Sequence, residues 1–522
     1  MTEAPAEGAS ARWLRHPLVL AAAVVLVYLP SLWGGWLRYD DDWLLEQNEL
    51  LTRGDLDVLP RILFDFELDR RLMLGAEYLP VRDLVTWLLR GVLGLDVTPL
   101  RIALLGAYVG AVLLLQFSAL RLPRAVQLAV WLFALHPVHA ESVAWLAGFK
   151  DVLALLFLFA ALALYGTRHR FALLGVPLLV GLACFAKAAV VIGPGVLWVF
   201  DRLGDRRTDF RTLGASAVVA VLAAGVHLWV GSLVAMYAEP LADGWLGRVL
   251  TVATILARYL GLSFFVLPSS VFYDVPATNT PDASSLGALA LLAVCAAIAA
   301  LGWRRGIRWP ALSLVLFLIG LLPVLQIVAP LQNRMADRYL LVAVLGPMIT
   351  LGFGVDALLG RLRASLAPLL LGGLGSLVGL LALLRGLIFA DPIALFDEGT
   401  ERAPRNAVAP FMLAEALVRE HRTAEAEGAY REAIRRDGFR TQRGLRAGNN
   451  LGRLLREQGR LDEAQALFVD LVARYPDDAR ALYNLAFLEF LRGDEAASSR
   501  HRAELMERFP EYRPNSDRPG PL

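Results

Sequence analysis

Long apolar segments alternate with short polar connections along the first 390 residues of the chain. A helix of about twenty apolar residues crosses the ~30 Å hydrocarbon core of a bilayer. The pattern therefore predicts an all-α polytopic bundle of about eleven spans. The predicted spans are approximately 17–36, 100–120, 125–146, 151–166, 171–186, 188–200, 213–235, 284–302, 310–329, 339–360 and 365–389.

The first apolar segment, 17–36, is longer than the apolar core of a signal peptide, and no small-x-small cleavage site follows it. We therefore expect a retained membrane anchor. Arg12, Arg15 and His16 precede this segment and an acidic loop follows it. Charge bias thus places the N-terminus in the cytoplasm and the acidic loop outside.

Arginine-rich connections test this topology, because short cytoplasmic loops are rich in Lys and Arg. If every cluster is cytoplasmic, 171–200 crosses twice, 249–267 does not cross, and the C-terminus lies outside. Arg258 and Tyr259 favour a helix at 249–267 that lies in the membrane interface or is buried against the bundle. The clusters are Arg121 and Arg124; Arg168 and Arg170; Arg202, Arg206, Arg207 and Arg211; Arg304, Arg305 and Arg308; and Arg361 and Arg363.

After Ala390 the pattern becomes charged and amphipathic, which divides the chain into a membrane domain, 1–390, and a second domain, 391–522. A 34-residue period aligns Asn450-Leu451-Gly452 with Asn484-Leu485-Ala486. This period and its small-residue positions resemble tetratricopeptide repeats, stacked helix pairs that form an α-solenoid. We predict repeats at about 407–440, 445–478 and 479–512, on the outer side of the membrane.

Composition narrows the function classes. The 522 residues are 57% hydrophobic with a net charge of +2, which is typical of a membrane protein and excludes a strongly basic nucleic-acid binder. Cys184 and Cys295 both lie in apolar segments, so neither a disulfide framework nor a zinc site is expected. Lys150 and Lys187 are the only lysines. This preference for arginine indicates a GC-rich bacterial genome, and hence the bacterial inner membrane.

Three aspartates, Asp40, Asp41 and Asp42, directly follow the first span and open the first outer loop, 37–99. A carboxylate held at the membrane surface can act as a general base that takes a proton from an acceptor hydroxyl. The alternative is that an aspartate, above all Asp42, caps an interfacial helix beginning at Trp43.

A second group of polar residues runs from His136 to Asp151, after the third predicted span. His136, His139 and Glu141 could hold a metal on one helix face, but Pro137 disturbs that face and no further ligand is near. We therefore expect hydrogen bonding and substrate contact. Lys150 is suited to bind phosphate, and the alternative is an ion pair with Asp151 or the aspartate loop.

A third group, from Gln332 to Leu340, places arginines in an outer loop, where charge bias disfavours them. A lipid-linked phosphate held by Arg338 or Arg334 would account for their position. The alternative is an ion pair with Asp337 or with the aspartate cluster.

Together these stretches resemble a known family over almost the whole chain. They are Tyr39-Asp40-Asp41, the His-Pro-Val-His-x-Glu-x-Val-Ala stretch of 136–144, the Ala-Asp-Arg-Tyr-Leu stretch of 336–340, and the C-terminal repeats. The chain is similar to the transmembrane-and-tetratricopeptide-repeat protein O-mannosyltransferases, within the GT-C glycosyltransferases. The family's Gly-Arg-x-Asp appears as Gly148-Phe149-Lys150-Asp151, and its Tyr-Arg-Pro-Leu as Tyr78-Leu79-Pro80-Val81 with Arg82 nearby.

The resemblance implies a GT-C bundle that transfers one sugar, with mannose expected, from a polyprenyl phosphate to a hydroxyl of an exported protein or peptide, with inversion. Asp40 or Asp41 would be the base, Arg338, Lys150 and Arg334 would bind donor phosphate, and no divalent metal or other cofactor is expected. His136, His139, Glu141, Arg82 and Tyr339 would contact substrates, and the repeats would recognise the acceptor on the periplasmic face. Alternatives are a lipid or envelope-glycan acceptor, or a non-enzymatic membrane-anchored scaffold.

Overall fold

The computed structural model describes residues 13–37, 39–52, 54–94, 96–234, 242–265, 268–327, 330–331, 333–363 and 365–512. Within these ranges every regular element is a helix. The chain divides into two compact units. The first comprises Met1–Val271 and Val275–Asp391, and the second comprises Phe272–Asp274 and Pro392–Leu522.

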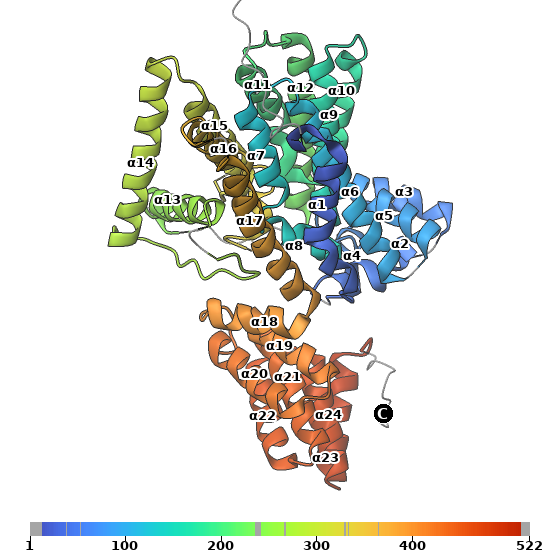
Figure 1. Cartoon of the computed structure of the whole chain (residues 1–522). Helices are drawn as coiled ribbons and strands as arrows, with labels where there is room; N and C mark the ends of the chain where they lie inside the picture. The colour runs from blue at the N-terminus through green and yellow to red at the C-terminus, as the bar shows by residue number, and fades with distance from the viewer. Residues whose placement is uncertain are drawn as a thin grey trace, which may run out of the picture. The chain divides into compact units, whose positions relative to one another are not determined.

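The first unit is a helix bundle (Figure 1). In it α6 packs against α9, α9 against α10, and α10 against α12. Likewise α7 packs against α16, α16 against α15, and α15 against α14. Short 3-10 segments, η2 (Leu29–Trp33), η5 (Leu146–Gly148), η6 (Ala188–Ile192), η7 (Leu322–Val324) and η8 (Asp337–Leu340), extend or join these helices. The helices are α1 (Pro17–Tyr28), α6 (Val97–Ala119), α7 (Arg124–Ala134), α8 (His139–Ala144), α9 (Phe149–Thr167), α10 (Ala172–Ala186), α11 (Gly193–Leu203), α12 (Phe210–Leu233), α13 (Gly244–Ser263), α14 (Ala283–Arg304), α15 (Trp309–Leu321), α16 (Leu345–Leu359) and α17 (Ala367–Ala390).

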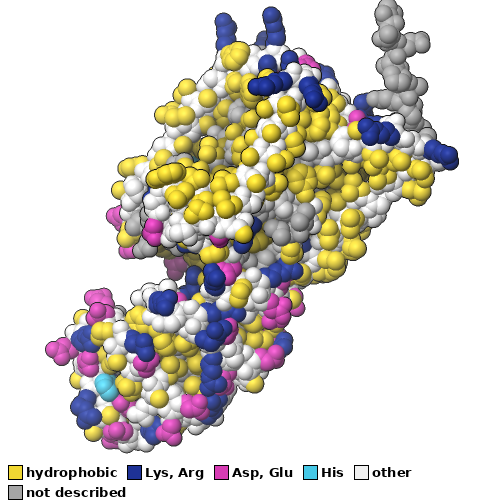
Figure 2. All heavy atoms as spheres, turned by 90° about the vertical axis from the view of Figure 1, so that its left-hand side faces the viewer, with side chains coloured by type: hydrophobic (Ala, Val, Ile, Leu, Met, Phe, Trp, Pro, Cys, Tyr) yellow, Lys and Arg dark blue, Asp and Glu magenta, His cyan; other side chains and the backbone are white. Residues whose placement is uncertain are grey.

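Six helical segments of the described chain are long and apolar enough to cross a membrane, namely α6, η5 with α9, α12, α13, α14 and α17. The remaining apolar helices have 10–17 residues. The count of eleven spans therefore stays a prediction. α13 meets the length and composition criteria although the charge pattern predicted no crossing there. Figure 2 shows a broad hydrophobic surface on the visible face of this unit.

Two predicted spans, 125–146 and 339–360, are interrupted where polar motifs occur. α7 ends at Ala134, and α8 begins only at His139. Pro137 lies in this break, and proline is unfavourable inside a helix because it has no backbone N–H and its ring clashes with the preceding turn. In the second case η8 precedes α16, which begins at Leu345. The interruptions bring irregular backbone into the bundle, which is tolerated where protein covers it.

Close helix crossings depend on glycine, as in many membrane proteins. A Cβ at Gly352 of α16 would overlap the carbonyl oxygen of Ala125 in α7, and a Cβ at Gly346 would overlap the carbonyl oxygen of Ser313 in α15. Neither neighbouring backbone can move without displacing its helix. These two glycines therefore set how closely α16 approaches both partners.

The Gly352→Ala variant should lower the stability of the bundle by about 1–3 kcal/mol, because overpacking forces the helices apart. Gly354→Ala on the same helix is the matched control, since a Cβ there meets nothing within 4 Å. The measurement is thermal unfolding of both variants in detergent. Equal unfolding temperatures would contradict the assigned crossing.

The first outer loop forms a small helical layer around a core of Leu50, Leu51, Val58, Ile62 and Leu74. Its elements are η3 (Asp42–Glu46), a π-helical turn, α2 (Glu49–Thr52), η4 (Leu56–Val58), α3 (Leu59–Phe64), α4 (Leu68–Met73) and α5 (Pro80–Leu93). α5 buries Arg82 and Asp83 and exposes Leu88 and Val92, 54% and 73% accessible. A helix that presents apolar side chains outward is suited to the membrane interface.

The second unit consists of α18 (Pro392–Arg402), α19 (Val408–Arg419), α20 (Thr423–Asp437), α21 (Gln442–Glu457), α22 (Leu461–Arg474), α23 (Ala479–Leu491) and α24 (Glu495–Arg508). From α18 to α24, consecutive helices pack against each other, and Ala426, Phe468 and Ala481 are buried in the core. Arg436 donates to the carbonyl oxygens of Thr400, Ala403 and Asn406. Its guanidinium therefore supplies hydrogen-bond donors to carbonyl groups at and just beyond the C-terminal end of α18. Hydrophobic, basic and acidic side chains are mixed over its surface (Figure 2).

Candidate active site

Asp41 anchors the start of the first outer loop to the bundle. Its side chain has no accessible surface, and its two oxygens accept hydrogen bonds from the backbone N–H groups of Leu37 (3.1 Å) and Ala147 (2.9 Å). Burial raises the pKa of Asp41 to about 6, although these two N–H groups and Arg101 oppose the rise. Asp41 is thus committed to holding two segments together.

Arg101, which the sequence reasoning missed, completes this anchor from the second turn of α6. Its guanidinium donates to the carbonyl oxygens of Ser31 (2.7 Å), Ala144 (2.7 Å) and Gly35 (2.5 Å). Gly34 is packed so closely that a Cβ there would lie 2.8 Å from Arg101 Nη2. An arginine inside an apolar segment is the signal that could have identified it, because such residues need a polar partner.

Asp40 has a different environment from Asp41. Its side chain is partly accessible and receives a hydrogen bond from the Trp43 side chain. Burial raises its pKa, and the positive charges of Lys150 and Arg338 counteract this rise. Of the two aspartates predicted as base, Asp40 is the one under the influence of two of the three predicted phosphate ligands, Lys150 and Arg338. Asp42 is the first residue of η3 and Asp41 occupies its N-cap position, so Asp42 is not the cap that the alternative expected.

Arg338 forms an ion pair with Glu141, which brings the second and third motifs together across 197 residues of sequence. The backbone N–H of Arg338 also donates to the other Glu141 oxygen at 2.9 Å. The guanidinium lies 5.4 Å from the ring centroids of both Trp145 and Tyr339. Both partners are almost fully buried, with 11% and 1% of their side-chain surfaces accessible. The expected partners of Arg338, Asp337 or the aspartate cluster, are therefore replaced by Glu141.

α13 contacts both motifs, the 136–144 stretch and the 336–340 stretch. The Tyr259 hydroxyl accepts from the N–H of Ala336 (3.1 Å) and donates to its carbonyl oxygen (3.3 Å). The His136 ring contacts the Ser263 carbonyl oxygen through Nε2 at 3.2 Å, and its Nδ1 accepts from the N–H of Val138. The 249–267 segment is thus buried against the bundle at Tyr259, which has no accessible surface.

The two histidines lie inside the protein. His136 and His139 are both fully buried. His139 packs between the rings of Phe133 and Tyr108, at 4.5 and 5.6 Å, and its ring nitrogens have no hydrogen-bond partner among the described residues. Their full burial favours a supporting role over substrate contact.

Lys150 pairs with Glu77 of the first outer loop, which was one of its two expected ion-pair alternatives, whereas Asp151, the other, pairs with Lys187. Arg82 also approaches Glu77, with Nη1 4.0 Å from the carboxylate, and binds Asp83 at 2.7 Å. Burial opposes ionisation of Glu77, but Lys150, Lys187 and Arg82 outweigh it and lower its pKa to about 2. Glu77 was not singled out by sequence, because one glutamate in an acidic loop carries no distinguishing pattern.

Arg334 has a different partner from Arg338: its Nη1 donates to the carbonyl oxygen of Val275 at 2.8 Å. Tyr339 remains beside Arg338. Within the described residues, no group of three or more His, Cys, Asp or Glu side chains is arranged to hold a metal ion.

Comparison with known proteins assigns the C-terminal unit. A family model of the tetratricopeptide repeat matches residues 449–498. The second unit carries tetratricopeptide repeats. This match spans parts of the predicted second and third repeats, and α21 to α24 supply their helix pairs. No curated protein matches the chain.

Proposed function

We propose that the chain is an integral membrane glycosyltransferase of GT-C type, which moves one sugar, with mannose expected, from a polyprenyl phosphate to a hydroxyl of an exported protein or peptide. Asp40 is the general base in this proposal, and Arg338 and Lys150 bind the donor phosphate. The observation that carries the proposal is that one partly accessible aspartate, Asp40, lies in the field of two cations supplied by distant segments.

The separation of roles between the two adjacent aspartates supports Asp40 as base. Both Asp41 oxygens already accept backbone hydrogen bonds, and an enclosed carboxylate cannot reach an acceptor hydroxyl. Asp40 retains access. A base must come within hydrogen-bond reach of the proton it takes, so geometry favours Asp40 before pKa is considered.

The cations retain donors for a phosphate although each is paired. Glu141 uses Nη1 of the Arg338 guanidinium, which leaves Nε and Nη2, and Glu77 accepts one of the three N–H donors of Lys150. The ion pairs also hold both cations in place before the donor arrives. Fixed charges near the leaving phosphate stabilise the charge that develops on it, which is often the largest catalytic term.

The direct test is transfer itself. Membranes that contain the protein are incubated with a labelled polyprenyl-phosphate monosaccharide, and the modified product is identified by mass spectrometry. Transfer to a protein or peptide is expected. Absence of transfer from any polyprenyl-phosphate sugar, with the protein present in the membrane, would overturn the proposal.

The pH profile should report on Asp40. Only the deprotonated carboxylate can accept a proton, so transfer falls as pH falls through its pKa. Burial raises that pKa above 3.8, and the acidic limb of kcat/KM should therefore lie above pH 3.8. Measuring initial rates across acidic pH checks this, with unfolding followed in parallel. A rate that stays constant down to pH 3.8 would contradict the assignment.

Removal of the repeat unit should distinguish a protein acceptor from a lipid acceptor. Deleting 391–522 is expected to abolish transfer to protein while leaving hydrolysis of the donor, because the repeats would hold the acceptor and not the sugar. The measurement compares transfer with release of free sugar. Unchanged transfer to a glycolipid by the truncated chain would favour the lipid acceptor instead.

A further inference from the structure

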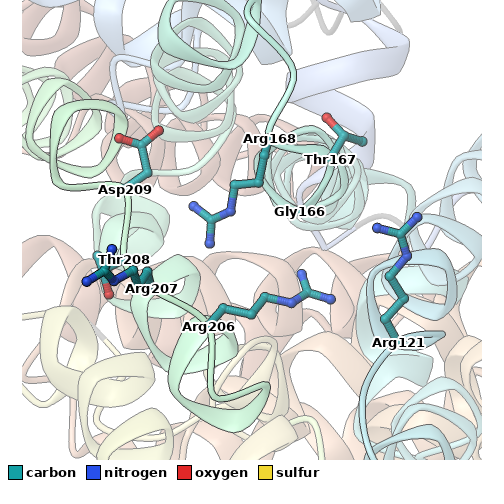
Figure 3. A pocket seen from close by; sticks show the side chains of 8 residues that line it. All are labelled: Arg121, Gly166, Thr167, Arg168, Arg206, Arg207, Thr208 and Asp209. Carbon is teal, nitrogen blue, oxygen red and sulfur yellow. The ribbon is translucent and has the colours of Figure 1, made fainter.

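An open pocket of about 730 Å³ lies at the end of α9 opposite to Lys150. α9 contains 19 residues and is therefore about 28 Å long, so this pocket is remote from the candidate active site. Figure 3 shows Arg168 and Arg206 extending into the space, with Arg121 across from them. Charge bias places this end of α9 at the cytoplasmic membrane surface.

The lining is strongly basic. Four arginines and Asp209 line the pocket, so the lining carries a net charge of +3. Asp209 is engaged elsewhere, because its Oδ1 accepts from the N–H groups of Arg211 and Thr212 and its Oδ2 accepts from the Thr212 hydroxyl at 2.6 Å. It caps α12 and does not neutralise the pocket.

Among the described residues, one of the four arginines forms an ion pair with a carboxylate. Arg168 pairs with Asp201, which is 2% exposed on its side chain and also accepts from the Tyr165 hydroxyl at 2.7 Å. In the part of the chain that the structure describes, Arg121, Arg206 and Arg207 form no ion pair with a carboxylate. Three guanidinium groups are therefore available to an anion.

The turn that carries two of these arginines is held in place from outside the pocket. Arg202 donates from Nη2 to the Arg206 carbonyl oxygen (3.0 Å) and to the Thr208 hydroxyl (2.6 Å). The turn therefore does not depend on a ligand for its shape. A pre-formed basic wall lowers the conformational entropy that a ligand must offset on binding.

We propose that this pocket binds a phosphate group, carried either by the head group of an anionic phospholipid or by a soluble phosphorylated molecule. Guanidinium groups match phosphate oxygens bidentately, and the volume is within the range of small-molecule sites. Basic pockets between membrane helices on the cytoplasmic side are suited to phospholipid head groups. General attraction of the protein to an anionic leaflet would require only positive charge. Binding in a defined pocket requires these particular arginines, so the two cases differ when charges are removed at different places.

The test compares two double variants of the full-length protein in nanodiscs. Arg121→Gln with Arg206→Gln removes two charges from the pocket, and Arg304→Gln with Arg305→Gln removes two exposed charges from another basic loop. Native mass spectrometry measures retained phosphatidylglycerol. In a second arm, inorganic pyrophosphate is titrated against protein in phosphatidylcholine nanodiscs while thermal unfolding is followed.

Binding of either probe should weaken about tenfold or more in the pocket variant and change little in the control, because only the pocket variant loses charge-assisted hydrogen bonds to the phosphate. Retention of phosphatidylglycerol identifies a lipid source, and stabilisation by pyrophosphate a soluble one. Equal losses in both variants, or no binding of either probe to the unmodified protein, would overturn the proposal. If the pocket variant does not fold, Arg207→Gln gives the same comparison through an exposed side chain.

Discussion

The Asp40→Asn variant is expected to lose sugar transfer by about 10²–10⁴-fold, because a positioned general base contributes that factor and an amide cannot take a proton. Its fold should persist, since an asparagine oxygen can still accept from Trp43. The measurement is the initial rate of transfer with the donor in excess, beside thermal unfolding of the purified variant. Normal transfer by well-folded Asp40→Asn would refute Asp40 as base.

Two neighbouring substitutions serve as controls for Asp40. Asp42→Asn removes the same charge two residues away and should leave transfer near the unmodified rate. Asp41→Asn should instead destabilise the protein by about 1–3 kcal/mol, because an amide accepts through one oxygen only and leaves one of two buried N–H groups without an acceptor. The three variants thus separate chemistry from anchoring.

The Arg338→Met variant is expected to lose both stability and transfer. Glu141, with 1% of its side chain accessible, would keep a buried charge without its partner, which costs roughly 3–5 kcal/mol. The donor phosphate would also lose its proposed bidentate ligand. Chemical or thermal unfolding in detergent measures the first loss, and the transfer assay measures the second.

Combining Arg338→Met with Glu141→Gln separates these two effects. Neutralising both partners removes the unpaired buried charge, so most of the lost stability should return. Transfer should not return, because the donor phosphate would still lack the positive charge of Arg338. Recovery of transfer in the double variant would show that Arg338 acts only as the structural partner of Glu141.

Local sequence patterns predicted several features of the candidate site. The charge pattern placed Asp40, Lys150 and Arg338 on one side of the membrane. In the structure Lys150 and Arg338 both act on the pKa of Asp40, while the side of the membrane stays a prediction. The same reasoning did not choose between partners: Lys150 was expected to bind phosphate or to pair with Asp151 or the aspartate loop, and it pairs with Glu77 of that loop, 73 residues away.

The interrupted helices show a second limit of the sequence pattern. Hydropathy treats 125–146 as one continuous apolar span, but α7 ends at Ala134 and His139 begins a new helix. The break is stable only because other segments satisfy its backbone: the Tyr28 hydroxyl donates to the carbonyl oxygen of His136 at 2.8 Å. Tyr28 is 108 residues distant, and no local pattern predicts that contact.

The sequence by itself determined what periodicity and composition encode: an apolar helical region, a repeat unit of 34-residue period, and polar motifs confined to a few connections. Only the tertiary structure decided that Asp41 anchors while Asp40 stays accessible, and that Glu141 holds Arg338 across 197 residues. Hydropathy and helix periodicity are local properties, whereas the partner of a buried charge is chosen by the packing of distant helices.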